Sequence, residues 1–326
     1  MRIMKSVGLS LLLLFLWSPL TSASTILVIE SYHAEYLWDQ SYKQGLKDML
    51  GMEHELVFFE MDTKRLPESK YQERAEAAWK VYQDLDPTLV ILGDDNALKY
   101  LAPMLLKTDT PVVYLGINAN PRKYGVVGAP NFTGVIERPL LRRSILMLEK
   151  LLPVKRVLVL LDSKETARVI KEDIFQGKDA MRLSGIYLDI KLVSRFSEWQ
   201  RYVLAAKDQG YDALIAGLYQ TLNDDSGLHV DPEVVIDWTS KNTEIPPFGF
   251  WDFSIGANKN IGGYVIFGYE EGKLAGQMAM EMLANKGKRL RQETGGQGRF
   301  MFSKSLLHKW GIDLPDYIAK QATLVD

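Results

Sequence analysis

The apolar run TILVIES, Thr25 to Ser31, is the clearest structural signal in the sequence. It is continuous and rich in β-branched residues, which predicts a strand buried on both faces of a parallel sheet. Downstream, Trp38 to Leu50 has helical spacing, and Glu55 to Met61 is typical of a second strand. This alternation of strand and helix predicts an α/β fold whose parallel sheets are covered by helices.

The alternation runs twice along the chain and restarts after Arg138-Pro139. The later strands expected in the first round are Leu89 to Leu92, Pro111 to Ile117 and Asn131 to Ile136. Those expected in the second round are Arg156 to Leu161, Ile186 to Val193, Ala213 to Leu218, Pro247 to Phe250 and Tyr264 to Phe267. Between them, Thr166 to Leu183 is expected to form one helix. Two rounds predict two domains, with short crossings near Glu137, Pro246 and Gly268 as a hinge.

Composition limits the classes of function. The chain has 326 residues, 47% hydrophobic and 25% charged, which is ordinary for a globular protein of about two domains. A net charge of -2 supplies no basic field for nucleic acid, so we expect no nucleic-acid partner. The absence of cysteine excludes disulfides, thiolate metal sites and cysteine nucleophiles.

The first 23 residues have the order of a secretory signal. Arg2 and Lys5 precede the apolar run Val7 to Trp17, and Thr21 to Ala23 offers small residues for cleavage. The apolar run is shorter than the roughly 20 residues that a membrane-spanning helix needs. We therefore expect a cleaved signal peptide over residues 1–23 and a free protein in the periplasm.

Polar and aromatic residues collect where the expected strands end. Ligands of open α/β sheets bind beyond the carboxyl ends of the strands, so these positions are candidate contacts. The residues expected to bind a ligand are Ser31, Tyr32, His33, Tyr36, Trp38, Asp62, Asp94, Asp95, Asn96, Asn118, Asp162, Thr166, Tyr219, Trp251 and Asp252. Two such faces, opposed across a hinge, would form a cleft for a small molecule.

Structural alternatives exist for several of these residues. His33 is equally consistent with a hydrogen-bonded loop residue, and Trp251 with a core residue between Phe250 and Phe253. The run Asp94-Asp95-Asn96 fits the N-cap of a helix, because short polar side chains satisfy free N–H groups there. The run Asp62 to Arg65 fits a local salt-bridge turn.

Common motifs for catalysis and cofactor binding are absent from the sequence. It contains no GxGxxG after the first strand, no GxxxxGK[ST], no HExxH and no GxSxG, and its 4 His are widely spaced. A carboxylate pair such as Asp94 with Asp162 leaves a glycosidase open as a weak alternative. We expect no catalytic residue, no metal and no cofactor.

Several segments carry a resemblance to a known family. They are Tyr36 to Asp39 (YLWD), Asp62 to Arg65 (DTKR), Leu92 to Tyr100 (LGDDNALKY), Pro111 to Arg122 (PVVYLGINANPR), Thr133 to Arg138 (TGVIER), Pro247 to Phe253 (PFGFWDF) and Ile261 to Gly268 (IGGYVIFG). With them the chain resembles the ABC-transporter substrate-binding family that has the type I periplasmic binding protein fold. The resemblance implies two doubly wound parallel-sheet lobes, joined by three crossovers, which close on a ligand. The expected division is residues 24–137 plus about 269–326 for one lobe and 138–268 for the other.

The expected function follows from the resemblance. We expect a monomeric periplasmic binding protein that captures a small polar or aromatic, amino-acid-like solute for the permease of an ABC importer. The ammonium of an amino acid would pair with Asp94, Asp95 or Asp252, and its carboxylate would meet a helix start near Asn96 or Ser163 to Thr166. The alternative is a ligand-binding subunit of a membrane sensor kinase. An exported hydrolase is the weaker alternative.

Overall fold

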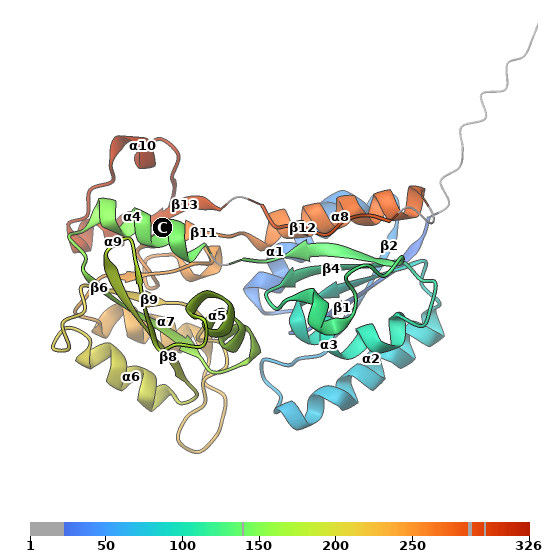
Figure 1. The fold of residues 1–326 in the computed structure, drawn as a ribbon, viewed down its shortest axis with the longest axis horizontal. Helices are drawn as coiled ribbons and strands as arrows, with labels where there is room; N and C mark the ends of the chain where they lie inside the picture. Colours follow the sequence, from blue (N-terminus) through green and yellow to red (C-terminus); the bar gives the residue numbers. More distant parts are fainter. Residues whose placement is uncertain (1–22, 139, 286–288, 297) are drawn as a thin grey trace, which may run out of the picture.

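The computed structural model describes residues 23–138, 140–285, 289–296 and 298–326. It shows two lobes side by side, each with a sheet covered by helices (Figure 1). The expected signal peptide falls on residues 1–22, outside the described residues, apart from Ala23. Across the described ranges, no helix has the length and apolar character needed to cross a bilayer.

The first lobe contains a six-stranded parallel sheet with the strand order β12-β5-β4-β3-β1-β2. Its strands are β1 (Thr25–Glu30), β2 (Glu55–Glu60), β3 (Leu89–Gly93), β4 (Val112–Ile117), β5 (Phe132–Ile136) and β12 (Glu293–Thr294). The helices of this lobe are α1 (Leu37–Leu50), α2 (Tyr71–Leu85), α3 (Asp94–Leu105) and α8 (Gly268–Ala284). The strand order reverses between β1 and β3, and such a switch point is where ligands of open α/β sheets bind.

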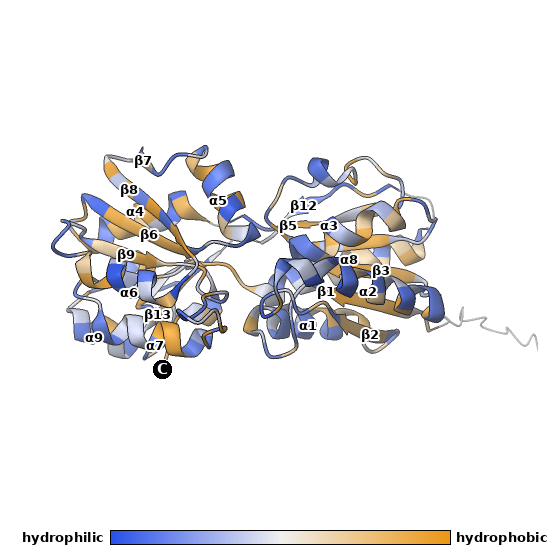
Figure 2. Cartoon of the chain, turned by 90° about the horizontal axis from the view of Figure 1, so that it is seen from below, coloured by the Kyte–Doolittle hydropathy of each residue, from blue (hydrophilic) through white to orange (hydrophobic). Residues whose placement is uncertain are grey.

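Burial explains why these runs form strands. Residues Ile26 to Ile29 of β1 and Leu89 to Leu92 of β3 are fully buried. Helices cover both faces of the sheet, so a continuous apolar run is stable there and an alternating one would not be. Figure 2 shows the hydrophobic strands enclosed by helices whose outer faces are hydrophilic.

The second lobe contains a five-stranded sheet with the order β10-β9-β6-β8-β7. Its elements are α4 (Leu141–Leu151), β6 (Arg156–Asp162), α5 (Glu165–Phe175), β7 (Ala180–Leu183), β8 (Ile186–Val193), α6 (Phe196–Ala205), β9 (Ala213–Ala216), α7 (Pro232–Asn242) and β10 (Pro247–Phe248). The expected single helix over Thr166 to Leu183 is wrong, because α5 ends at Phe175 and β7 pairs antiparallel with β8. The turn between them, Ser184-Gly185, has positive φ at both residues, as a tight hairpin turn requires.

A third, three-stranded sheet completes the structure. It contains β11 (Gly262–Val265), β13 (Arg299–Ser303) and β14 (Thr323–Val325), with α9 (Lys304–Trp310) and α10 (Asp316–Ala319) in the same tail. The tail lies beside the second lobe in Figure 1, and Lys309 donates a hydrogen bond to the carbonyl of Ser240 on α7. We expected all residues after about 269 to join the first lobe. In the structure, β12 pairs with β5 of the first lobe, whereas β13 pairs with β11, which precedes α8 in the chain.

The chain passes between the lobes after Glu137, before Gly268 and between Thr294 and Arg299. Pro246, expected near a crossing, lies inside the second lobe, where its carbonyl accepts from the N–H of Leu214. We therefore propose that the first lobe comprises residues 23–137 and 268–294, and that the second comprises 140–267 and 299–326.

Close backbone contact between α1 and α8 holds the returning chain to the first lobe. A Cβ atom at Gly272 of α8 would overlap the carbonyl of Tyr42 of α1, and one at Gly45 would overlap the carbonyl of Tyr269. These two glycines therefore let the helices approach more closely than side chains would allow.

Replacing Gly272 with Ala should force α1 and α8 apart. Overpacking of this kind lowers the free energy of unfolding by about 1–3 kcal/mol. We expect a loss near the upper end of this range, because the added methyl group would meet helix backbone, which cannot easily move. Urea unfolding measures it. Gly296→Ala is the control, since the nearest atom to its Cβ would be 3.8 Å away. Equal stability of the two variants would contradict close packing of α1 on α8.

Candidate functional site

Ten residues from both lobes enclose a small cavity at the carboxyl ends of the strands, called here the inner cavity. They are Tyr32, Tyr36, Trp38, Lys64, Asp94, Asn118, Glu137, Thr166, Leu218 and Trp251. The cavity volume is about 10 Å³, close to that of one water-sized probe. The lobes are therefore closed on one another, and side chains fill the space between them.

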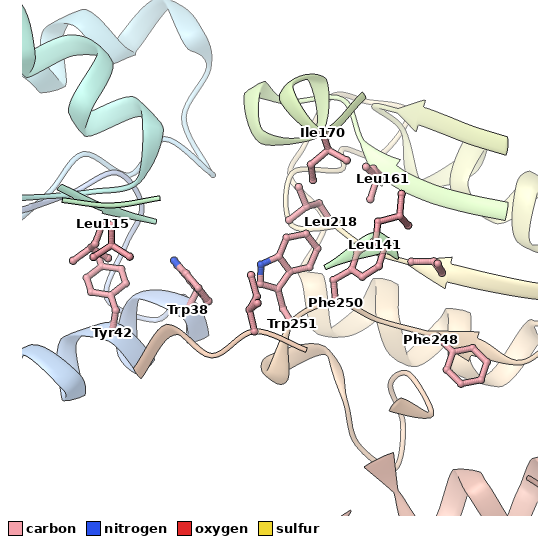
Figure 3. Packing of buried hydrophobic residues seen from close by; sticks show 14 of the residues in the cluster. Trp38, Tyr42, Leu115, Leu141, Leu161, Ile170, Leu218, Phe248, Phe250 and Trp251 are labelled. Carbon is pink, nitrogen blue, oxygen red and sulfur yellow. The ribbon is translucent and has the colours of Figure 1, made fainter. Parts of the chain in front are cut away.

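A row of aromatic rings runs across the cleft from one lobe to the other. Ring centroids are 5.1 Å apart for Tyr32 and Tyr36, 5.7 Å for Tyr36 and Phe253, and 6.3 Å for Phe253 and Trp251. The first two rings follow β1, and the last two follow β10. Trp38 of α1 and Trp251 both lie in the space between the lobes (Figure 3). The contact between Tyr36 and Phe253 therefore joins the two lobes.

Trp251 is anchored to the hinge as well. Its indole N–H donates to Oε1 of Glu137 at 2.8 Å, directly after β5 where the chain leaves the first lobe. Trp251 is 2% exposed and also contacts Phe250, so the ring is both a core residue and a wall of the cavity. The two interpretations of Trp251 left open by the sequence are thus compatible.

Among the residues that line the inner cavity, Lys64 carries the positive charge, and Asp94 and Glu137 carry carboxyl groups. The Lys64 ammonium lies 4.3 Å from the ring centroid of Tyr32 and 4.8 Å from that of Tyr36. Lys64 is 7% exposed, and burial lowers its pKa against the pull of Asp162 and Asp94. An ammonium held between two rings is the arrangement of a cation–π cage.

Several polar atoms around this cage are buried without a hydrogen-bond partner among the described residues. The acceptors are Oδ2 of Asp94, Oδ2 of Asp162, Oδ1 of Asn118 and both carboxyl oxygens of Asp39, and the donor is Nε1 of Trp38. Buried polar groups in native proteins are almost always satisfied, by protein, water or ligand. The cluster therefore predicts a molecule that supplies mainly hydrogen-bond donors.

Burial also shifts the protonation of the carboxyl groups. It raises the pKa of Asp94 well above its usual range, and the neighbouring charges of Asp39 and Glu137 add to the effect. Burial and Glu271 likewise raise the pKa of Glu137. The pKa of Glu271 rises to about 7, mainly by burial, although the N–H of Gly116 favours its charged form. These carboxyl groups therefore keep their protons to a higher pH than exposed carboxyl groups do.

Two of the aspartates at the strand ends have an uncommon backbone conformation. Asp62 after β2 has φ of 56° and Asp94 after β3 has φ of 66°, both in the left-handed region. Asp tolerates this region better than most residues, but it remains uncommon outside glycine. Such outliers cluster at functional sites, which supports a role for these two strand ends.

Two larger cavities adjoin the inner cavity. The vestibule, of about 430 Å³, is lined by His33, Glu35, Tyr36, Leu37, Arg65, Tyr219, Gln220, His229, Asp231, Pro232, Glu233 and Phe253. The outer cavity, of about 60 Å³, is lined by Tyr32, Thr63, Lys64, Glu68, Tyr71, Asp95, Asn96, Lys99, Tyr100, Lys164, Glu165, Thr166, Arg168 and Thr221. Tyr36 is shared with the vestibule, and Tyr32, Lys64 and Thr166 are shared with the outer cavity.

An ion pair spans the lobes at the outer cavity. Nη2 of Arg168 on α5 lies 3.1 Å from Oε1 of Glu68 in the first lobe, and both side chains are about half exposed. Exposed pairs contribute at most about 1 kcal/mol. The pair therefore does not hold the lobes together alone.

The structure brings most of the expected residues together. Tyr32, Tyr36, Trp38, Asp94, Asn118, Thr166 and Trp251 line the inner cavity, and Asp162 acts on Lys64 from beside it. Asp95 and Asn96 reach the outer cavity, and His33 and Tyr219 reach the vestibule.

Three of the expected residues have structural contacts instead. Ser31 donates to the carbonyl of Gly93 at 2.6 Å and accepts from the N–H of Ala97 at 2.8 Å. Asp62 accepts from Nε of Arg65 at 2.7 Å, which is the salt-bridge turn considered above. Asp252 accepts from the N–H of Phe253 at 2.8 Å.

The expected capping by Asp94, Asp95 or Asn96 is wrong. The helix begins at Asp94, so these residues lie in its first turn, and the hydroxyl of Ser31 accepts from the N–H of Ala97 instead. Asp95 accepts from the N–H groups of Asn118 and Ala119 after β4. Its role is therefore to hold two strand ends in place.

Lys64 and Glu137 were missing from the expected set. Both follow strand ends, and Lys64 belongs to the run Asp62 to Arg65 that the sequence singled out. Which residue of such a run points inward depends on the backbone turn, and the sequence pattern does not determine it.

Comparisons with known proteins find likeness in structure only. No family model matches the chain, and a search of curated proteins finds no match. An ABC domain from Streptococcus pneumonia, solved in complex with L-Trp, has a TM-score of 0.69 at 17% identity, covering 94% of this chain and 100% of that one. A substrate binding protein with adhesive properties from Clostridium difficile, solved in a ligand-free, open form, has a TM-score of 0.62 at 12% identity. The likeness covers 93% of this chain and 100% of that one.

A transcription repressor of the LacI family from Corynebacterium glutamicum has the same fold, with a TM-score of 0.54 at 12% identity, covering 85% of this chain and 96% of that one. These likenesses confirm the expected fold class, two α/β lobes with the type I periplasmic binding protein architecture. At these identities they establish the fold, and the fold serves both transport proteins and repressors.

Glu271 should make stability fall as pH rises. Its pKa in the folded protein is about 7 against an ordinary 4.5, so the folded state holds a proton that the unfolded chain has lost. The free energy of unfolding therefore falls by on the order of 3 kcal/mol between pH 4.5 and about pH 7, because the stabilisation from this proton is complete below pH 4.5 and lost by about pH 7. Glu271→Gln should flatten this part of the pH profile in denaturant unfolding.

Glu149→Gln, at an exposed position on α4, is the control and should leave the profile unchanged. An unaltered slope in Glu271→Gln would show that this carboxyl group does not carry the buried proton.

Proposed function

We propose that this protein captures a small polar or aromatic, amino-acid-like solute between its two lobes and releases it unchanged to a membrane partner. The partner we favour is the permease of an ABC importer, with the protein acting as a periplasmic monomer after removal of its signal peptide. A sensor kinase that reads the occupied state is the second possible partner. The order of residues 1–23 supports export.

The observation that carries the proposal is the cage of rings and unsatisfied acceptors shared by both lobes. Tyr32, Tyr36 and Asp94 come from the first lobe, and Phe253 and Trp251 come from the second. A ligand in contact with both sides interacts fully with the protein only in the closed state. Its binding free energy therefore favours closure.

The chemistry of the cage fits an amino-acid-like ligand. Asp94 lines the inner cavity, and its Oδ2 has no hydrogen-bond partner among the described residues, so this carboxyl group can accept from an ammonium group. The rings of Tyr36 and Trp251 can contact an aromatic or aliphatic side chain. The vestibule beyond Tyr36 and Phe253 has room for the remainder of a ligand.

The size of the inner cavity adds a mechanical requirement. At about 10 Å³ it holds no amino acid in the closed arrangement seen here. Ligand entry therefore requires the lobes to separate at the contact of Tyr36 with Phe253. The closed form with ligand must then differ from this one in the position of at least one cage side chain.

Native mass spectrometry of protein purified from the periplasm should show a retained small solute, because closed clefts release ligands slowly. Calorimetry with that solute should then show Asp94→Asn weakening binding at least about 10-fold through loss of a buried charge partner. Trp251→Phe should weaken it by a similar factor, since it removes the bond to Glu137 and part of the cavity wall.

The matched control is Trp79→Phe, a ring stacked on Tyr82 outside the cleft. Unchanged affinity in both cleft variants would remove this site assignment. Chemical conversion of the solute by the protein would remove the proposed function itself.

A further inference from the structure

Lys64 is the central observation for a more specific inference about the ligand. Its ammonium lies over the rings of Tyr32 and Tyr36, at 4.3 and 4.8 Å from their centroids. No carboxylate in the described part of the chain forms a direct ion pair with it, although Asp162, Asp94 and Asp39 attract it from longer range. A lysine side chain is thus held in the interior by rings and a diffuse negative field.

The surroundings of Lys64 are those of a site for a ligand cation. Unpartnered acceptor atoms of Asp94, Asp162 and Asn118 lie buried around the cage. Rings with carboxylates behind them recognise organic ammonium groups in proteins. Two rings around the Lys64 ammonium, with unpartnered acceptors buried in the same region, have the composition of an ammonium site.

We infer that the cleft is built for a ligand with an organic ammonium group, and that Lys64 takes the place of that group when the cleft is empty. The inference rests on the proposed function and specifies its ligand class. A tethered ammonium offsets the buried carboxylates, so the lobes close without ligand, and an arriving ammonium ligand displaces Lys64.

The structure also provides a place for the displaced side chain. Lys64 lines both the inner and the outer cavity. The outer cavity contains Glu68 and Glu165, which lie 3.1 and 3.7 Å from Arg168 and can share that pairing with an ammonium close to solvent. A change in the side-chain torsions of Lys64 is then sufficient to vacate the cage.

Chemical rescue tests this inference without knowledge of the natural ligand. Lys64→Ala deletes three methylene groups and an ammonium, which n-propylammonium replaces atom for atom. We expect n-propylammonium chloride to raise the melting temperature of Lys64→Ala by roughly 2 °C or more at saturation, with little effect on the wild type. The neutral analogue n-propanol should have no such effect on either protein.

Lys47→Ala is the matched control, because Lys47 lies over the ring of Phe58 outside the cleft at 5.6 Å. Rescue of Lys47→Ala to the same extent, or no rescue of Lys64→Ala, would overturn the inference.

Small-angle scattering of solute-free protein gives a second, independent test in case Lys64→Ala does not fold. Lys64→Met keeps the side-chain volume without the charge and should have a larger radius of gyration than the wild type, whereas Lys64→Arg should not. Equal radii for all three proteins would also overturn the inference. Neither test uses the natural solute, so failure of the proposed transport role would be seen separately, as the absence of a retained solute.

Discussion

The lobes meet at a ring contact, Tyr36 of the first lobe against Phe253 of the second, with centroids 5.7 Å apart. Aromatic pairs contribute only about 0.5–1.5 kcal/mol beyond the area they bury. The exposed ion pair of Arg168 with Glu68 adds at most about 1 kcal/mol. An interface between lobes that is held by contacts this weak opens readily. A ligand that contacts both lobes can therefore control whether the cleft is open or closed.

Closure of the cleft also depends on the carboxyl groups that it buries. Asp39, Asp94 and Glu137 are almost fully buried, and each has a raised pKa because burial disfavours its charged form. An empty closed cleft must therefore hold protons or a cation near these groups. Lys64 supplies one such cation from within the protein. A ligand ammonium would offset the same buried carboxyl groups and would also contact both lobes.

Local pattern predicted much of the fold from the sequence. The apolar run after Thr25 and the two rounds of strand and helix were enough for the α/β class and the two lobes, because burial on both faces leaves a distinct signature. The hairpin at Ser184-Gly185 was missed although its turn residues were visible. The tail was assigned by continuity along the chain, whereas the antiparallel pairing of β13 with β11 depends on long-range contacts that local pattern does not encode.

The residues of the candidate site were likewise predictable where they depend on local pattern and not where they depend on long-range contacts. The rule that ligands bind at strand ends pointed to Tyr32, Asp94 and Asn118, and these three residues line the inner cavity. It could not separate Asp62, which turns toward Arg65, from Lys64 two residues later, which enters the cage. That choice depends on the left-handed backbone at Asp62. Glu137 was missed because its partner, Trp251, is 114 residues away in the sequence.

Interlobal distance as a function of ligand tests the central claim most directly. The sequence contains no cysteine, so Glu76→Cys on α2 and Glu172→Cys on α5 give two unique spin-label positions, one on each lobe. For protein stripped of solute, pulsed electron paramagnetic resonance should give the short distance of lobes closed over Lys64 together with a population of longer distances from open molecules. Adding back the released solute should leave one short distance. A single distribution that stays unchanged while the solute binds would contradict capture by closure of the two lobes.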